Sequence, residues 1–227
     1  MSNRGEINNN TDHDVYMTRH SARADRDNLN WKPLPGHARD DTELSVNGEQ
    51  ATRELAQRFQ DLPVTHIVSS PFYRCLQTVA PIALAKGISI KVEPGICEVL
   101  STFPPGFWDT PRLLKETNFP IDTSYEPIVP RNKLTREFSD GQAAERAQRA
   151  AMAIRETLDG PILFCGHGAS CFGIGQAFGT GGYVGYSSFS HFRLHEKDEH
   201  CSWKTVEFGD VSHLSEKLRR QSLDSAW

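Results

Sequence analysis

Three short apolar stretches, widely separated in the chain, each lead to a basic side chain, and they constrain the fold more than any other feature. They occupy residues 14–18, 66–69 and 162–165. Segments with the apolar spacing of helices lie between them, and strands that alternate with helices favour a largely parallel sheet covered on both faces. We therefore predict an α/β fold: a three-layer sandwich with a mostly parallel central sheet and helices on both faces.

The segments between these strands predict the covering layers. Pro81 should kink or end the helix that contains it, because proline lacks an amide hydrogen and clashes with the preceding turn. Three arginines, Arg146, Arg149 and Arg155, should form the solvated face of a later helix. From apolar periodicity we expect helices at 48–60, from Ser70-Pro71 onward, at 140–158 and at 169–178, and strands at 88–92, 187–195 and 202–208.

Length, charge and cysteine usage bound the class of protein. The 227 residues suit one α/β domain, so we assign residues 1–13 to a flexible tail and 14–227 to a single domain. A net charge of -4 argues against a general nucleic-acid or membrane surface, so neither partner is expected. The five cysteines are odd in number and form no C-x-x-C pair. They indicate reduced thiols and hence a cytoplasmic, or nuclear, protein.

The basic side chains that follow the strands predict an anion site. Arg19 and His20 follow the first strand, Arg74 follows the second, and His167 follows the third. Arg23 lies three residues after His20. Because open α/β sheets bind ligands at the carboxyl ends of their strands, we expect these side chains to converge. Arginine offers planar paired donors that suit phosphate, so the sequence predicts a phosphate pocket.

Four motifs, in order along the chain, resemble those of the histidine phosphatase superfamily, whose members have the phosphoglycerate mutase-like fold. Within it, the resemblance is nearest to the phosphatase domains of the Sts (suppressor of T-cell receptor signalling) proteins and to the ecdysteroid-phosphate phosphatases. The motifs are Arg19-His20-x-x-Arg23, Ser69-Ser70-Pro71-x-x-Arg74-Cys75-x-Gln77-Thr78, Glu93-Pro94-Gly95-x-x-Glu98 and Gly166-His167-Gly168.

This resemblance implies a role for each candidate residue. His20 would be the nucleophile that forms a phosphohistidine, and Glu98 the general acid and later the base. His167 would be a further catalytic residue. Nearby positive charges oppose protonation of His20 and so keep it nucleophilic. No metal or other cofactor is expected, since side chains supply the positive charge. The phosphate would be bound by Arg19, Arg23, Arg74 and His167.

The expected activity is hydrolysis of phosphate monoesters, and the expected partner is a phosphorylated small molecule or a phosphotyrosine protein. The preference for aryl or other apolar esters rests on aromatic residues in two long loops, 24–45 and 99–136, which could line the mouth of the pocket. Ordinary packing of these aromatics is the alternative, and a homodimer is left open. The aromatic residues are Trp31, Phe103, Phe107 and Trp108.

Two other functions stay open. One is a phosphoglycerate mutase or sugar bisphosphatase on the same fold. The other is a weakly active scaffold protein that only binds phosphate. Its main support is Ser21, which stands where the family has a glycine directly after the nucleophile. Glycine adopts backbone conformations, and permits close approaches, that serine does not.

Overall fold

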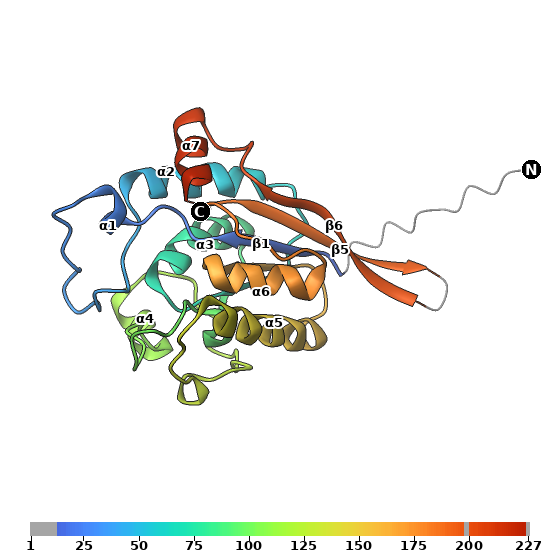
Figure 1. The fold of residues 1–227 in the computed structure, drawn as a ribbon, viewed down its shortest axis with the longest axis horizontal. Coiled ribbons are helices and arrows are strands. Elements are labelled where there is room, and N and C mark those ends of the chain that lie inside the picture. The colour runs from blue at the N-terminus through green and yellow to red at the C-terminus, as the bar shows by residue number, and fades with distance from the viewer. Residues whose placement is uncertain (1–12, 198–199, 226–227) are drawn as a thin grey trace, which may run out of the picture.

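A single six-stranded sheet forms the centre of the molecule, with the strand order β3-β2-β4-β1-β5-β6 (Figure 1). The computed structural model describes residues 13–197 and 200–225; the expected tail at 1–13 therefore lies almost wholly outside the described residues. The first four strands pair in parallel, whereas β5 and β6 are antiparallel. The strands are β1 Val15–Arg19, β2 His66–Ser69, β3 Ile90–Val92, β4 Ile162–Gly166, β5 Phe189–Lys197 and β6 His200–Asp210.

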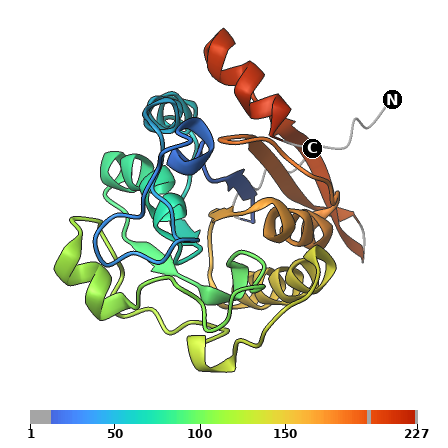
Figure 2. The ribbon, with the colours of Figure 1, turned by 60° about the vertical axis from the view of Figure 1, so that its left-hand side comes forward.

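Two helical layers cover the sheet, as Figure 2 shows from the side. Helices α2 (Val46–Arg58) and α3 (Tyr73–Lys86) pack on the face that carries Tyr16 and Leu163. Helices α5 (Asp140–Thr157) and α6 (Gly168–Phe178) pack on the opposite face. Because successive strand residues point to opposite faces, the central strands need apolar residues at every position, which is why they are apolar runs. The predicted three-layer α/β architecture is confirmed.

The remaining helices are shorter and lie outside these layers. No helix in the described part of the chain is long and apolar enough to cross a membrane. All five cysteines are free thiols, and Cys201 alone among them is exposed. The short elements are α1 (Ala24–Asp27), α4 (Thr110–Glu116), α7 (Glu216–Asp224), and the 3₁₀ turns Pro94–Ile96 and Arg131–Lys133.

The helix does not end at Pro81, as one form of the prediction had it, because α3 continues through this residue to Lys86. Its neighbours Val79, Ile82 and Ala83 are buried in the core under the sheet. The apolar area that these residues remove from water outweighs the single hydrogen bond that proline cannot make. The start of the helix also differs, since Phe72 rather than Ser70 occupies the N-cap position.

The prediction of a solvated arginine face on α5 was wrong for Arg146. Arg149 is exposed, as expected, and Arg155 is partly exposed, with a donated bond to the carbonyl of Gly160. Arg146 lies instead on the buried side, where its guanidinium meets the carboxylate of Glu137 at 2.7 Å. Such a side chain can be buried because its charge is paired and each donor finds an acceptor.

The closest approach of α5 and α6 gives a stability prediction. A Cβ atom added at Gly173 would lie 2.0 Å from the carbonyl oxygen of Ala144. We expect Gly173→Ala to lower the free energy of unfolding by about 1–3 kcal/mol, because the helices must separate. Gly141→Ala is the matched control, since its Cβ would meet nothing nearer than the Ser139 hydroxyl at 3.7 Å. Urea denaturation of both variants makes the comparison; equal stability would contradict the tight helix contact.

Candidate active site

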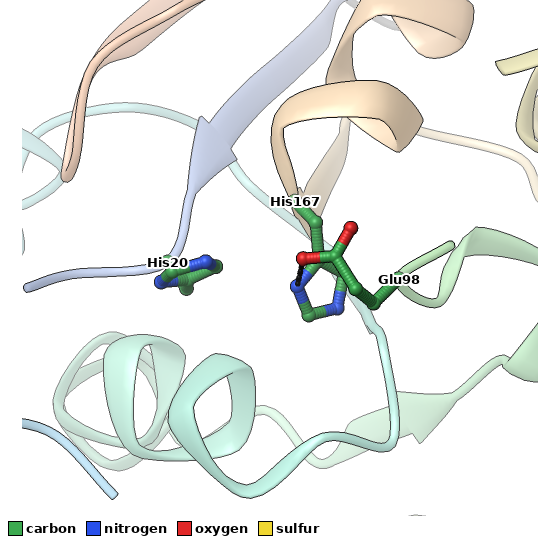
Figure 3. A group of neighbouring side chains, drawn as sticks. All are labelled: His20, Glu98 and His167. Carbon is green, nitrogen blue, oxygen red and sulfur yellow. Dashed lines mark ion pairs between the residues drawn. The ribbon is translucent and has the colours of Figure 1, made fainter. Parts of the chain in front are cut away.

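Two histidines and a carboxylate meet at the carboxyl edge of the sheet (Figure 3). His20 directly follows β1, and His167 directly follows β4 at the N-cap of α6. Because β1 and β4 are parallel neighbours with Arg19 opposite Gly166, the two rings lie side by side, with centroids 5.2 Å apart. Glu98 reaches them from the loop after β3. Strand pairing therefore brings these three residues together as the sequence predicts.

His20 is held as a neutral imidazole with a defined tautomer. Its Nδ1 lies 2.8 Å from the carbonyl oxygen of Ser21. A carbonyl only accepts hydrogen bonds, so Nδ1 carries the proton and Nε2 keeps its lone pair. Burial, followed by the charges of Arg74, His167 and Arg19, holds the pKa of His20 well below its usual range. The ring is thus a free nucleophile in a positively charged setting.

His167 is fully buried and bonded through both ring nitrogens. Its Nε2 lies 2.7 Å from the hydroxyl of Ser70, and its Nδ1 lies 3.1 Å from Arg74 Nη2 and 3.4 Å from Glu98 Oε2. Burial opposes its protonation, but the charges of Cys75 and Glu98 outweigh burial and raise the pKa of His167. When neutral, Nδ1 accepts from Arg74; when protonated, Nδ1 donates to Glu98.

Arg74 and Glu98 form the third side of the site. Arg74 donates to the carbonyl of Asp40 at 2.9 Å and to Glu98 Oε2 at 3.3 Å. Its Nε is buried and has no partner among the described residues. Burial favours the neutral form of Glu98, but His167 and Arg74 outweigh it and hold the pKa of Glu98 well below its usual range. In the free site Glu98 is therefore a carboxylate.

The other two predicted arginines differ in what they contact. Arg19 donates from Nη1 to the carbonyls of Val184 and Ser225, and its Nε is buried without a partner in the described part of the chain. Arg23 binds Asp25 through two bonds of 2.9 and 2.8 Å. Within residues 13–197 and 200–225, no hydrogen bond or ion pair links Arg23 to His20 or His167. The structure thus brings Arg19 to the site and directs Arg23 toward its own helix.

Two contacts of the histidines were not predicted. The ring of Tyr186 lies beside that of His20, tilted by 41° with centroids 5.3 Å apart, and the Arg19 guanidinium lies over the tyrosine ring at 4.5 Å. Tyr186 comes from a glycine-rich loop before β5, where no periodicity marks it as a site residue. Ser70 is the second: its hydroxyl accepts from the amide of Phe72 at 3.3 Å and also bonds His167 Nε2 at 2.7 Å. Its place beside Arg74 in the second motif was the available signal.

Ser21 fits after the nucleophile without strain in the backbone. Among the described residues, Ser187 is the only non-glycine with a positive φ, at 53°, so Ser21 does not need the glycine conformation. Its amide donates to the Thr78 hydroxyl at 2.9 Å, and its own hydroxyl pairs with that of Ser187. The backbone conformation of Ser21 therefore gives no support to the alternative of a weakly active scaffold protein.

His20, Glu98 and His167 have ligand atoms within 4.8 Å of one another, a spacing that could also hold a metal ion. Arg74 argues against this use of the site. Its Nη2 lies next to both His167 and Glu98, and a guanidinium stays charged at all accessible pH values. A divalent cation on the same atoms would be repelled, whereas an oxyanion would be attracted. The donor set fits an anion.

The aromatic residues of the long loops divide between packing and surface. Phe107 and Trp108 are buried, Phe107 against Phe72 at 5.4 Å and Trp108 against His37 at 3.9 Å between centroids. For these two, the packing alternative is confirmed. Phe103, whose side chain is 46% exposed, remains accessible, and Trp31 is partly exposed.

The family model of the histidine phosphatase superfamily (branch 1) matches residues 15–212. The chain belongs to this family. It is 32% identical over 152 residues to the ecdysteroid-phosphate phosphatase of Drosophila melanogaster, a match that covers 63% of this chain and 20% of that protein. It is 34% identical over 123 residues to the human ubiquitin-associated and SH3 domain-containing protein A, covering 47% of this chain and 18% of that protein.

The fold agrees with this membership. The tungstate complex of the ecdysone phosphate phosphatase from Bombyx mori superposes with a TM-score of 0.65 at 20% identity, covering 86% of this chain and 92% of that one. The resemblance inferred from the four motifs, including the branch they indicated, is confirmed. The chain matches only about a fifth of the length of the two curated relatives, so their substrates and partners do not transfer with the fold.

The depressed pKa of His20 predicts a pH dependence of stability. The unfolded chain binds a proton at this residue near its usual pKa of 6.5, whereas the folded site resists it. As the pH falls below 6.5, the unfolded state gains protons and stability is lost, by up to about 1.4 kcal/mol per pH unit. His20→Asn should remove this loss. Urea denaturation at pH 7, 6 and 5 compares the two proteins; parallel pH profiles would argue against a neutral His20.

Proposed function

We propose that this histidine phosphatase hydrolyses phosphate monoesters through a covalent phosphohistidine on His20. The observation that carries the proposal is the state of His20: a buried neutral ring, with Nδ1 occupied by a carbonyl, among three cationic side chains. A basic lone pair inside a positive pocket attracts a phosphoryl group and can attack it. The family membership supports phosphatase chemistry in general.

The reaction follows from the positions of His20 and Glu98. His20 Nε2 attacks phosphorus, the P–N bond forms, and the bond to the ester oxygen breaks. That oxygen leaves as an alcohol or phenol with a proton from Glu98. The resulting carboxylate then takes a proton from water as the water oxygen attacks phosphorus; the new P–O bond forms, and the P–N bond breaks with its electron pair returning to His20 Nε2. Inorganic phosphate leaves, and both residues return to their first state.

The charge of the pocket supplies the stabilisation. Arg19 and Arg74 each have an Nε that is buried without a partner in the described part of the chain, so each has a donor to offer a phosphoryl oxygen. His167 adds a donor when protonated. The first amides of α6, which begins directly after His167, would add further backbone donors. Arg23 would join them by exchanging Asp25 for phosphate.

The depressed pKa of Glu98 in the free site fits this cycle. A general acid must hold a proton, yet His167 and Arg74 keep Glu98 ionised when the site holds no anion. A bound phosphoryl dianion offsets both cations and adds a negative charge, so it raises the pKa of Glu98. Substrate binding would therefore lead to protonation of Glu98, and Glu98 would become a carboxylate again after phosphate leaves.

For the leaving group we propose an aryl or other apolar ester, phosphotyrosine included. Two observations support it: the Tyr186 ring lies beside the nucleophile, and a relative is named for a steroid phosphate. Loops 24–45 and 99–136 are also tied together, by a bond from Trp108 Nε1 to the carbonyl of Gly36. An apolar leaving group that packs against Tyr186 and these loops would gain about 25 cal/mol of binding free energy per Å² of apolar surface removed from water.

His20→Ala tests the nucleophile. The variant should fold and lose turnover of p-nitrophenyl phosphate entirely, since no other residue can form the intermediate. Acid quench of the parent protein with labelled substrate should trap phosphate on His20. EDTA should leave the parent rate unchanged. Full activity in the alanine variant would remove the proposed mechanism, and activity lost in EDTA but restored by a divalent metal would replace it. An inactive parent would leave only the scaffold function.

A substrate panel tests the leaving-group class. The ratio kcat/KM should be at least about tenfold higher for phosphotyrosine or a steroid phosphate than for 3-phosphoglycerate or fructose 2,6-bisphosphate. The physical reason is that an apolar leaving group removes its surface from water at the pocket mouth. About 1.4 kcal/mol of transition-state stabilisation raises kcat/KM tenfold. All four are measured in one buffer. A preference for either of the last two would place the protein with the mutases and sugar bisphosphatases.

A further inference from the structure

We propose that Arg146 and Glu137 are positioning residues that hold the loop at 94–98, and thereby Glu98, in its reactive place. The inference rests on the role of Glu98 in the proposed function. It begins from an unexpected feature, an arginine in the middle of α5 that is only 9% exposed. Burying a charge away from water costs free energy, so a buried guanidinium is expected only where it is ion-paired and all its N–H groups are hydrogen-bonded.

The guanidinium of Arg146 makes contacts on all sides. It donates to both carboxylate oxygens of Glu137, at 2.7 and 2.9 Å. It also donates to the carbonyl oxygens of Gly95 at 2.9 Å, Cys97 at 3.3 Å and Glu98 at 3.1 Å. With a longer bond to the carbonyl of Pro94 at 3.5 Å, one side chain thus bonds four carbonyls of the five-residue loop that ends at Glu98.

The loop depends on these bonds. Residues 94–97 are buried, and their carbonyls need partners that no strand supplies. The loop is also pressed against α5: a Cβ at Gly95 would lie 2.8 Å from Cβ of Ala150. Only a long side chain from α5 with several donors can reach carbonyls in so tight a space, and arginine is the one residue with five.

Glu137 fixes the other end of the same segment. Its Oε2 accepts from the amide of Leu100 at 3.1 Å, and its own amide donates to the carbonyl of Leu100 at 3.1 Å. Glu98 is therefore held on both sides, through its own carbonyl by Arg146 and through Leu100 by Glu137. The ion pair joins these two anchors into one unit.

The side chain of Glu98 takes its place from this unit. Its carboxylate lies 3.3 Å from Arg74 Nη2 and 3.4 Å from His167 Nδ1. Arg146 donates hydrogen bonds to the backbone carbonyl of Glu98 and not to its carboxylate, so its direct contact with this residue fixes the position of the backbone. Displacing a general acid by about 1 Å can cost about 10²-fold in rate.

The test compares Arg146→Lys with a matched control on the same helix. Arg149→Lys changes the same side chain type one turn away, where the guanidinium is exposed. We expect Arg146→Lys to lower kcat for phenyl phosphate by about 10²-fold and for p-nitrophenyl phosphate by less than about tenfold. A good leaving group needs little help from an acid. Arg149→Lys should leave both rates unchanged.

Where Arg146→Lys fails to fold, the paired variant Arg146→Met with Glu137→Leu replaces it. Removing both partners avoids leaving Glu137 buried and unpaired. In either variant, hydrogen–deuterium exchange should be faster in peptides covering residues 94–100 and unchanged in the strands β1 and β4. Unchanged exchange at 94–100, or equal losses with both esters, would overturn the proposal.

Glu98→Gln separates this proposal from the proposed function. If Glu98 is the acid, the single variant Glu98→Gln loses turnover of phenyl phosphate more than that of p-nitrophenyl phosphate. Adding Arg146→Lys to Glu98→Gln should then lower kcat for phenyl phosphate by less than about twofold. If the fold-loss of kcat in the double variant equals the product of the two single-variant losses, Arg146 acts independently of Glu98 and the positioning role is overturned. A Glu98→Gln variant without leaving-group selectivity would instead overturn the acid role of Glu98, while the exchange measurement still decides whether Arg146 holds the loop.

Discussion

The parallel pairing of β1 with β4 is the constraint on which the site depends. It sets Arg19 opposite Gly166, so the residues that follow, His20 and His167, emerge as neighbours from one edge of the sheet. Their positive surroundings are costly without an anion, because buried cations repel one another. Glu98 relieves part of this cost in the free site. The same imbalance gives the pocket its attraction for phosphate, which can offset the charge more completely.

Much of this could be predicted from the sequence because the decisive signals are local. Apolar runs that end at His20, Arg74 and His167 identify buried strands and their carboxyl ends, and the sheet then brings those ends together. The motif order added the family. Helix boundaries were close for the same reason: capping residues and periodicity act over a few positions.

What could not be predicted depends on partners distant in the chain. Arg146 resembled a solvated helix residue, since nothing near it in the sequence shows that Glu137 and four loop carbonyls surround it. Tyr186 lacks any local pattern, and Pro81 lies in a helix that its buried neighbours stabilise. At Ser21 the local signal was misleading. The replacement of the family's glycine by serine suggested backbone strain, but the φ angle of Ser21 is not positive and its hydroxyl pairs with that of Ser187.

The loop of Glu98 is held by hydrogen bonds to α5, whereas His20 and His167 directly follow strands of the sheet. The two halves of the chemistry therefore have separate supports. Under the proposed mechanism, sequence change in α5 or near Glu137 would alter how the departing alcohol is protonated and leave phosphoryl capture at the sheet edge unchanged. In that mechanism α5, although it lies outside the group of His20, His167 and Arg74, would be a site where the choice of ester is set.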